Sequence, residues 1–215
     1  MLGNKQIAVA TDGQVARLRE YLVAKDFIEI FPPHIGARLS IPGCETFDFS
    51  HRAGIQGTLA VSASYYLVSM LKDLGRTYSI SSSFRANLPS EEPPSNCLYE
   101  YRLLQAMREG DIGVAMQLHE DLVCTAIDYA LTKSQVLTDD HVTLLKSVKP
   151  PFERITYHDA ISQLQCPNDT DFQLPHHLTV CRKFGNRPII NRDSPDGSPV
   201  LLNGSDFLDC WKAGT

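Results

Sequence analysis

The chain has 215 residues, of which 43% are hydrophobic and 21% are charged, and its formal net charge at pH 7 is −5. This is the composition of an ordinary globular protein, which disfavours both a disordered chain and a membrane-embedded one. The negative net charge gives no general attraction to phosphate backbones, so contact with a nucleic acid would need a local basic patch.

The first residues lack the charged stretch and long apolar core that mark a secretory signal, so we expect a cytoplasmic protein. Its six cysteines stand far apart without a CxxC pair. This spacing disfavours a zinc site and, in a reducing compartment, it also disfavours disulfides. A chain of this length can bury one good core, so we expect a single domain over residues 1–215.

The first regular elements are expected before residue 34. Apolar residues at helical spacing over 14–25 predict an amphipathic helix, whose apolar face includes Val23. A strand is expected over 27–31, where apolar and acidic residues alternate. Pro32 and Pro33 end this strand, because proline cannot donate to a ladder and fixes φ.

Further strands and a polar loop come next. Residues 58–75 predict a short strand followed by a helix that stops at Gly75. The segment 77–86, with the sequence TYSISSSFRA, is expected to be a buried strand. The polar, proline-rich segment 87–96 is predicted to be a loop, and 98–107 predicts the strand that follows it. Together they form a strand–loop–strand unit.

The second half of the chain is expected to be mainly helical. Residues 111–131 repeat apolar side chains every three or four positions for about five turns, which predicts the longest helix. A short helix is expected over 156–164, with Thr156 as its N-cap. Another helix is expected over 176–184, followed by a strand over 187–191.

Two other kinds of site have weaker support in the sequence. His176 and His177, with Asp169 and Asp171, offer metal-binding groups. Adjacent histidines on a helix point apart, however, so we expect no metal site built from these side chains. A cysteine nucleophile served by a histidine has no local signature here.

Segments far apart in the chain resemble one family. They are DFIEI followed by Pro33, FRAN at 84–87 with EY at 100–101, PFERITY at 151–157, and FGNRPIINRDSP at 184–195. In this order they resemble the class II aminoacyl-tRNA synthetases of the aspartate, asparagine and lysine subgroup. The resemblance implies an α+β fold, with an antiparallel sheet flanked by helices that is incomplete at its C-terminal end, because the third family signature is not found. It also implies that no anticodon-binding domain is present.

The resemblance implies an ATP site on the strand–loop–strand unit. Arg85, directly after Phe84, is the expected catalytic residue. It would hold the attacking carboxylate and the α-phosphate of ATP, because a rigid guanidinium binds two oxygens at once. Asn87 stands at the acidic position of the family's FRAE sequence, Glu100 would accept hydrogen bonds from the nucleotide, and Tyr101 would stack under adenine. The cofactors implied are ATP and Mg²⁺.

The resemblance also implies substrate and partner contacts. Ser62 and Ser64 stand where the family has a serine and a glutamine that help to hold the amino acid. Gln105 stands where the family tends to place an acidic anchor for the substrate ammonium, so amino-acid recognition must be altered or absent. Pro33 would lie at the isologous interface of a homodimer.

These likenesses predict a divergent aspartyl- or asparaginyl-tRNA synthetase-like ligase. It would use ATP to adenylate a carboxylate, usually that of an amino acid, and would transfer the acyl group to tRNA or to another acceptor. Two alternatives stay open. A dimeric binding or regulatory paralogue would keep the fold without turnover. A truncated synthetase would lack the last strands of the sheet and would expose an edge.

Overall fold

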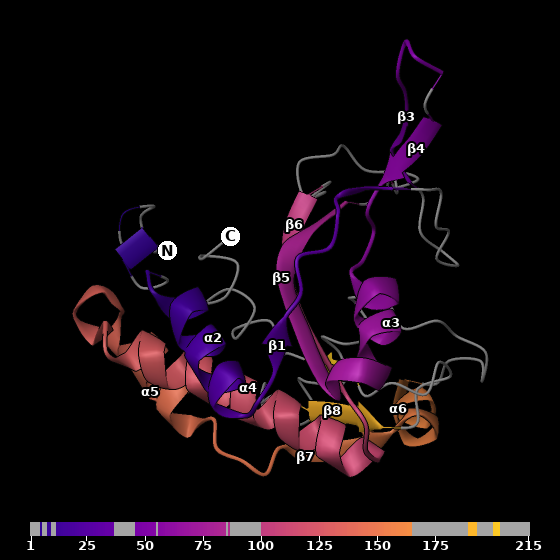
Figure 1. Ribbon diagram of the computed structural model, residues 1–215. Coiled ribbons are helices and arrows are strands. Elements are labelled where there is room, and N and C mark those ends of the chain that lie inside the picture. Colours follow the sequence, from indigo (N-terminus) through magenta and orange to yellow (C-terminus); the bar gives the residue numbers. More distant parts are fainter. Residues whose placement is uncertain are drawn as a thin grey trace. The chain divides into compact units, whose positions relative to one another are not determined.

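The structure is a computed structural model, and it describes residues 5, 8–9, 12–36, 46–54, 56–84, 86, 100–164, 189–192 and 200–202. For residues 101, 189–192 and 200–202 it describes the backbone alone. The chain divides into two compact units (Figure 1). The hairpin unit is Leu22–Glu109, and the helical unit combines Met1–Tyr21 with Gly110–Thr215.

A long antiparallel pair of strands lies at the centre of the hairpin unit. β5 (Arg76–Phe84) and β6 (Glu100–Arg108) pair along their whole nine-residue length. β1 (Ile28–Glu29) lies along the other side of β5 and pairs with it in parallel (Figure 1). Aromatic and β-branched residues suit such a pleated surface, and Thr77 and Tyr78 of β5 are fully buried.

α3 (Ser64–Leu74) comes directly before β5. Gly75 ends it with a φ of 72°, and the Gly75 N–H donates to the Leu71 carbonyl at 2.7 Å. Glycine adopts this positive φ without steric cost, so the predicted stop is confirmed. The helix lies against the hairpin, because Thr77 Oγ1 donates to the Leu67 carbonyl at 3.2 Å.

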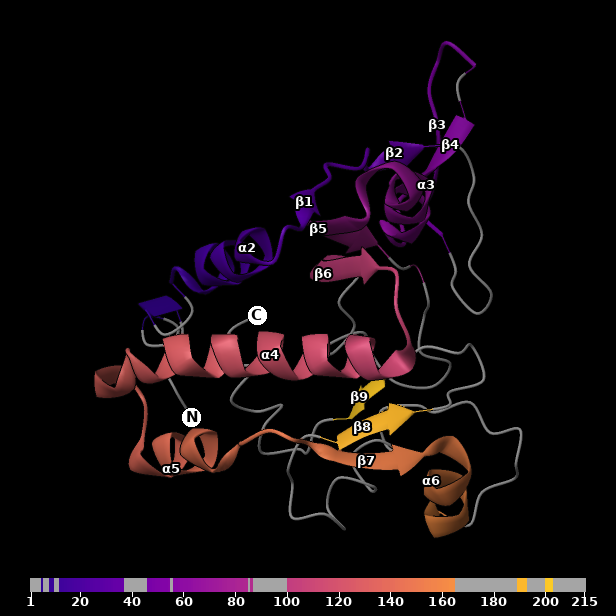
Figure 2. The same ribbon diagram turned by 60° about the horizontal axis from the view of Figure 1, so that its bottom comes forward.

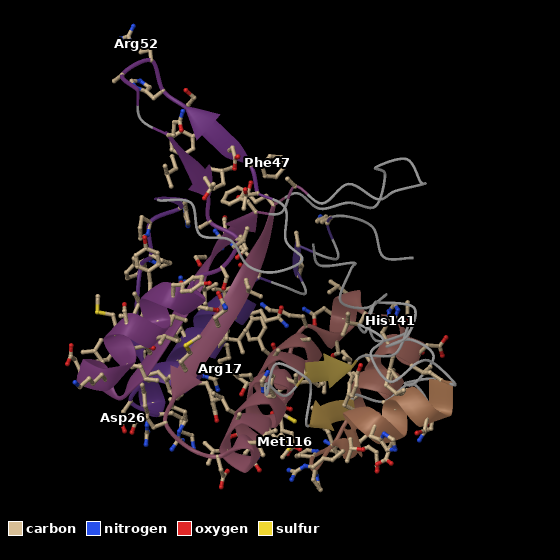
Figure 3. All side chains as sticks on the ribbon, turned by 90° about the vertical axis from the view of Figure 1, so that its right-hand side faces the viewer. Arg17, Asp26, Phe47, Arg52, Met116 and His141 are labelled. Carbon is tan, nitrogen blue, oxygen red and sulfur yellow. The ribbon has the colours of Figure 1, made fainter. Side chains whose placement is uncertain are left out.

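A second small sheet completes the described part of the hairpin unit. β4 (Gln56–Leu59) pairs antiparallel with β3 (Asp48–Ser50) and with β2 (Ile35–Gly36). Gly57 brings two backbones together, since a Cβ there would come within 2.6 Å of a carbonyl oxygen of β2. The β3–β4 hairpin carries Arg52 at its outer tip (Figure 3).

The helical unit is organised around α4 (Ile112–Leu131). Asp111 caps this helix by accepting a hydrogen bond from the Val114 N–H at 3.0 Å, which satisfies one of its free donors. The predicted long helix is therefore confirmed. An apolar core joins α4 to the segments that follow it, and it contains Met116, Val123, Ile127, Leu145, Val148 and Phe152.

α5 (Asp139–Ser147) has no counterpart among the elements predicted from the sequence. It follows a single 3₁₀ turn (Ser134–Val136). Thr138 caps α5 by accepting from the His141 N–H at 3.2 Å, and its first turn is acidic, as the helix dipole favours. The cap signal was present in the sequence, but the apolar residues of α5, Val142, Leu144 and Leu145, lie within about one turn, so no apolar repeat extends along the helix.

A third small sheet lies in the helical unit. β7 (Glu153–Thr156) pairs in parallel with β8 (Ile189–Arg192), and β8 pairs antiparallel with β9 (Val200–Leu202). Figure 2 shows these strands in order, with β8 between β7 and β9. The strand predicted over 187–191 is therefore confirmed as β8, with its bounds shifted toward the C-terminus.

Two further predicted helices are confirmed as α2 (Gln14–Ala24) and α6 (Tyr157–Leu164). Thr156 caps α6 as expected, because its Oγ1 accepts from the Asp159 N–H at 3.0 Å. The prediction that Val23 lies on the apolar face of α2 is wrong, since Val23 is 60% exposed. Adjacent helix positions point about 100° apart, and the neighbouring leucine takes the buried position.

The predicted α+β class, with antiparallel strand pairs flanked by helices, is confirmed. The described strands form three sheets of three strands each, and two of these sheets also contain a parallel pair. The helix predicted over 176–184 lies outside the described residues. The single domain expected over 1–215 stays a prediction.

Candidate functional site

The residues predicted to hold the substrate meet in one hydrogen-bonded cluster of the hairpin unit. Gln105 lies in β6, Ser62 precedes α3, and Ser64 is the first residue of α3. Gln105 Nε2 donates to Ser64 Oγ at 2.7 Å and to Ser62 Oγ at 2.9 Å. The two serine hydroxyls are 2.7 Å apart. We call these three residues the serine–glutamine cluster.

A backbone contact fixes the orientation of the Gln105 amide. The Ala63 N–H donates to Gln105 Oε1 at 2.8 Å. A backbone N–H can only donate, so the oxygen of the amide must face it and the NH₂ group must face the serines. Ser62 Oγ also accepts from the Ser64 N–H at 3.1 Å, which satisfies a free donor at the start of α3. Both N–H donors of the Gln105 amide are therefore used within the chain.

Two buried hydroxyls lie on the same face of the hairpin as Gln105. Ser79 of β5 stands directly opposite Gln105, and Ser83 stands opposite residue 101. Side chains of directly paired residues project from the same face of a sheet. Ser79 is 1% exposed and Ser83 is fully buried, and neither Oγ has a hydrogen-bond partner among the described residues. Unpaired buried hydroxyls are uncommon, because burial without a partner is unfavourable.

The predicted ATP residues lie at the end of the hairpin where β6 begins. Glu100 is exposed at the first position of β6, opposite Phe84. The backbone of Tyr101 lies in β6 opposite Ser83, whereas its side chain lies outside what the structure describes. Arg85 and Asn87 also lie outside the described residues. The ATP-binding and catalytic roles of these residues stay predictions.

Pro33, predicted at a dimer interface, is exposed in the segment after β1. It borders a small, open pocket together with Ser62 and Tyr66. Large apolar side chains on either side of Pro33 are also exposed, Phe31 at 81% and Ile35 at 59%. Its predicted role at a dimer interface stays a prediction.

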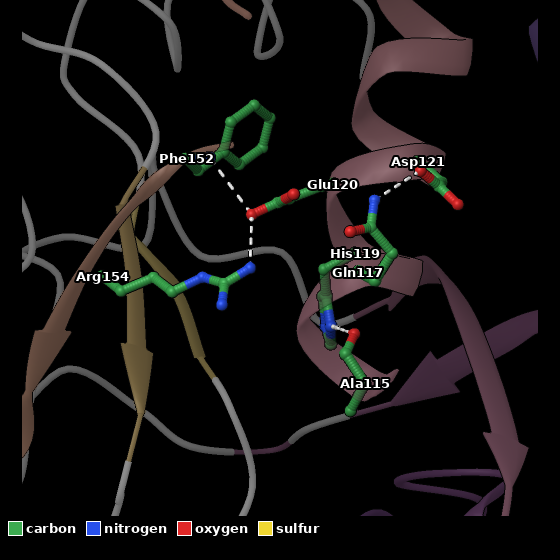
Figure 4. A network of polar contacts seen from close by, with 7 residues as sticks. All are labelled: Ala115, Gln117, His119, Glu120, Asp121, Phe152 and Arg154. Atoms are coloured by element: carbon green, nitrogen blue, oxygen red, sulfur yellow. Dashed lines mark hydrogen bonds and ion pairs between the residues drawn. The ribbon is translucent and has the colours of Figure 1, made fainter. Parts of the chain in front are cut away.

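Sequence reasoning missed a second polar cluster, which lies in the helical unit (Figure 4). Glu120 of α4 is 1% exposed, and its Oε1 accepts from the Phe152 N–H at 3.1 Å. The same oxygen lies 3.4 Å from Nη2 of Arg154, whose side chain is 39% exposed. Met116 and Val123 of the apolar core flank Glu120 at helical spacing. A glutamate at a position of the apolar stripe was the signal in the sequence. We call Glu120, Phe152 and Arg154 the glutamate cluster.

Among the described residues, Tyr21, which contacts α4, and Cys124, which lies within α4, have shifted pKa values. Tyr21 donates to Asp121 Oδ2 at 2.5 Å, and burial, followed by this hydrogen bond, raises the pKa of Tyr21. Burial, followed by the nearby Asp128, raises the pKa of the Cys124 thiol. A thiol with a raised pKa carries little thiolate near neutral pH, which makes Cys124 a poor nucleophile.

Two other kinds of feature are absent from the described residues. No group of three or more His, Cys, Asp and Glu side chains there is arranged to hold a metal ion. The candidate metal ligands His176, His177, Asp169 and Asp171 all lie outside these residues. Among the described helices, none has the length and apolar character that a membrane span requires.

Comparisons with known proteins agree on one family. Its model, described as tRNA synthetases class II (D, K and N), matches residues 5–203. The asparagine–tRNA ligase of Pyrococcus abyssi is 29% identical over 150 residues, which cover 68% of this chain and 34% of that protein. This chain thus spans about a third of the length of that relative.

Solved structures are similar in fold to this chain. Asparaginyl-tRNA synthetase from Pyrococcus horikoshii, complexed with asparaginyl-adenylate, matches with a TM-score of 0.76 and 24% identity, over 94% of this chain and 51% of that one. The Entamoeba histolytica asparaginyl-tRNA synthetase matches with a TM-score of 0.77 and 21% identity, over 98% and 56% of the two chains. At this level of identity the likeness shows a shared fold.

Proposed function

Because the chain belongs to the class II tRNA synthetases of the D, K and N group, we propose that it carries an AMP-forming ligase site that adenylates a carboxylic acid. The observation that carries this proposal is the serine–glutamine cluster. Ser62, Ser64 and Gln105 were proposed as substrate contacts from the sequence alone, and hydrogen bonds of 2.7 and 2.9 Å join them. Gln105 lies in β6, the strand that also contains Glu100 and Tyr101.

The proposed reaction joins the acid to AMP. A carboxylate oxygen of the substrate attacks the α-phosphorus of ATP, an oxygen–phosphorus bond forms, and the bond from the α-phosphorus to the leaving pyrophosphate breaks. Arg85 binds the attacking carboxylate and the α-phosphate, where charge accumulates in the transition state. Positioning of this kind, with no covalent enzyme intermediate, accounts for most of the catalysis in related phosphoryl chemistry.

The nucleotide contacts are assigned to the same end of the hairpin. Tyr101 stacks on adenine, Asn87 donates to the nucleotide through its amide, and Glu100 accepts from it. Mg²⁺ carried by ATP neutralises phosphate charge, and it usually needs only one or two carboxylates in addition to the phosphates and water. The exposed carboxylate of Glu100 fits that requirement.

The acceptor of the acyl group is tRNA or another nucleophile. The relatives of this chain are named asparagine–tRNA ligases, which favours tRNA. The net charge of −5 gives no general attraction to nucleic acid, so binding of tRNA would rest on local contacts. Binding of a labelled tRNA transcript, measured at two salt concentrations, would test this acceptor.

A second candidate function is supported by the Gln105 amide. Both of its N–H groups donate to serines of the same chain, and its oxygen accepts from the Ala63 N–H. A cluster that satisfies itself leaves few groups free for a substrate. This favours a binding or regulatory paralogue that keeps the nucleotide site without turnover.

We also propose a homodimer through the surface around Pro33. Phe31 and Ile35 are exposed on either side of it, and exposed apolar side chains that gather in this way often mark a protein interface. Sedimentation of the wild type and of Phe31→Asp tests this assembly. We expect a dimer that the substitution converts to a monomer, whereas a monomeric wild type contradicts the proposal.

ATP–pyrophosphate exchange across the standard amino acids and other carboxylic acids tests the ligase site. We expect exchange in the wild type and a loss of at least about 100-fold in Arg85→Ala, because the transition-state charge loses its cation. The exposed Arg52 at the tip of the β3–β4 hairpin provides the matched control, Arg52→Ala, which should keep full exchange. Binding of ATP by a folded wild type without exchange would favour the binding paralogue.

A further inference from the structure

The face of the β5–β6 hairpin that carries Gln105 differs in charge from the opposite face. Strand residues alternate between faces, and the pairing register assigns each residue of the two strands to one of them. The charged residues all fall on the face opposite Gln105; these are Arg76, Glu100, Arg102 and Arg108. The face of Gln105 has only uncharged side chains where they are described; these are Thr77, Ser79, Ser81, Ser83, Leu103, Gln105 and Met107.

Among the described residues, α3 packs on this face and adds no charged side chain to it. α3 contacts it through the Leu67 carbonyl and through Ser64. The two charged residues of α3, Lys72 and Asp73, are exposed. The described surroundings of the serine–glutamine cluster therefore contain hydroxyls, an amide and apolar groups, without a carboxylate.

Such surroundings discriminate against an ammonium group. A cation that leaves water needs a carboxylate or several free acceptors, and without them the loss of hydration is not recovered. The Gln105 oxygen accepts from the Ala63 N–H at 2.8 Å and from Ser62 Oγ at 3.1 Å, so it has little capacity left for an ammonium. An α-amino acid at this cluster would have to place its charged amine among neutral hydroxyls and apolar groups, which compensate a cation less well than a carboxylate does.

The same surroundings suit a neutral polar group. Ser79 and Ser83 are buried on this face and have no hydrogen-bond partner among the described residues. A hydroxyl can both donate and accept, so it can pair with an amide, a hydroxyl or a carbonyl of a ligand. Pairing with such a group would remove the unfavourable burial of one of these serines, since the two stand four strand positions, roughly 13 Å, apart.

We propose that the acid activated at this site is one without a charged α-amine, such as a carboxylic acid that carries a neutral amide or hydroxyl group. This inference rests on the proposed ligase function and specifies its substrate class. The chemical step is unchanged, since the carboxylate oxygen forms the bond to the α-phosphorus, pyrophosphate leaves, and an amine takes no part. The selectivity arises where the substrate meets Gln105 and the serines.

Two stable mimics of the acyl-adenylate test the inference on the whole chain by isothermal titration calorimetry. One is asparaginyl sulfamoyl-adenosine, and the other is the same molecule without its α-amino group, which makes its acyl part that of succinamic acid. We expect the compound without the amine to bind on the order of 100-fold more tightly, because the described part of the site holds no carboxylate to compensate a cation that leaves water. A third titration uses ATP alone.

Substitution of Gln105 sharpens the test. Gln105→Glu places a carboxylate at the cluster while the serine hydroxyls can turn to donate to it, so this variant should reverse the preference between the two mimics. Gln56→Glu makes the same chemical change at an exposed position of β4 and should leave the preference as it is in the wild type.

The outcomes separate the inference from the proposed function. Tighter binding of the compound without the amine supports both of them. Binding of ATP together with equal or tighter binding of asparaginyl sulfamoyl-adenosine, or with no binding of either mimic, overturns the inference and leaves the nucleotide site standing. No binding of ATP or of either mimic by the folded protein overturns the proposed function and the inference with it.

Discussion

The two units bury polar groups in different ways. In the helical unit, the glutamate cluster buries one carboxylate, which holds the Phe152 N–H and faces a partly exposed arginine. In the hairpin unit, the serine–glutamine cluster uses one neutral amide and two hydroxyls. A buried carboxylate is very unfavourable when its partners are lost, whereas neutral groups can change partners more easily. The glutamate cluster is therefore suited to stabilising a core, and the serine–glutamine cluster is suited to binding a ligand.

The largest expected change in stability comes from a substitution that removes the glutamate cluster. Glu120→Ala should lower the free energy of unfolding by about 2–3 kcal/mol, because the buried Phe152 N–H loses its acceptor and a cavity is left. Urea denaturation measures this change. Arg154→Ala removes only the partly exposed partner of Glu120 and should lower the free energy of unfolding by less than about 1 kcal/mol. Equal losses of stability in the two variants would contradict the view that the hydrogen bond from the Phe152 N–H contributes more than the ion pair with Arg154.

A smaller effect is expected when the serine–glutamine cluster is broken. Gln105→Ala should lower the free energy of unfolding by about 1–2 kcal/mol, since the Ala63 N–H loses its acceptor while the serine hydroxyls can turn to other partners. The exposed Gln56→Ala should stay within about 0.5 kcal/mol of the wild type. A loss in Gln105→Ala that matches the loss in Glu120→Ala would remove the contrast between the two clusters.

The hydrogen bond from Tyr21 to Asp121 gives a prediction that depends on pH. Tyr21→Phe should lower the free energy of unfolding by about 1 kcal/mol near neutral pH. Folding raises the pKa of Tyr21, so the folded chain holds this proton more strongly than the unfolded chain does. The contribution is therefore complete below a pH of about 10, the ordinary pKa of tyrosine, and is lost as the pH rises further. Urea titrations of both proteins at several alkaline pH values should show their difference shrinking, and a constant difference would contradict the assignment.

The smallest expected effect concerns Ser79. Its hydroxyl is buried without a partner among the described residues, so Ser79→Ala should be neutral or should raise the free energy of unfolding by up to about 1 kcal/mol. Thermal unfolding of the two proteins measures this difference. A clear loss of stability would indicate that the hydroxyl has a partner in the unliganded protein, and it would weaken the ligand site proposed on this face.

Local signals in the sequence predicted most of the elements that the structure describes. Gly75 and Thr156 were correctly assigned as the end of one helix and the cap of another, because these roles depend on a residue and its near neighbours. α5 was missed, since its apolar residues lie within about one turn and give no repeat along the helix. Val23 was misplaced, since spacing alone does not say which of two adjacent apolar residues faces the core.

The candidate site was predicted only in part, because the residues that meet in it lie far apart along the chain. Motifs and periodicity, which are local signals, predicted the family, most of the helices and strands, and the residue types that bear on ligand binding. The tertiary structure decided which polar groups meet. Gln105 reaches Ser64 across 41 residues and Glu120 reaches Phe152 across 32, and both contacts depend on strand register and helix packing. The same register places the charged side chains of β5 and β6 on one face and leaves the other face, where the substrate class is proposed to be selected, without a charge among its described side chains.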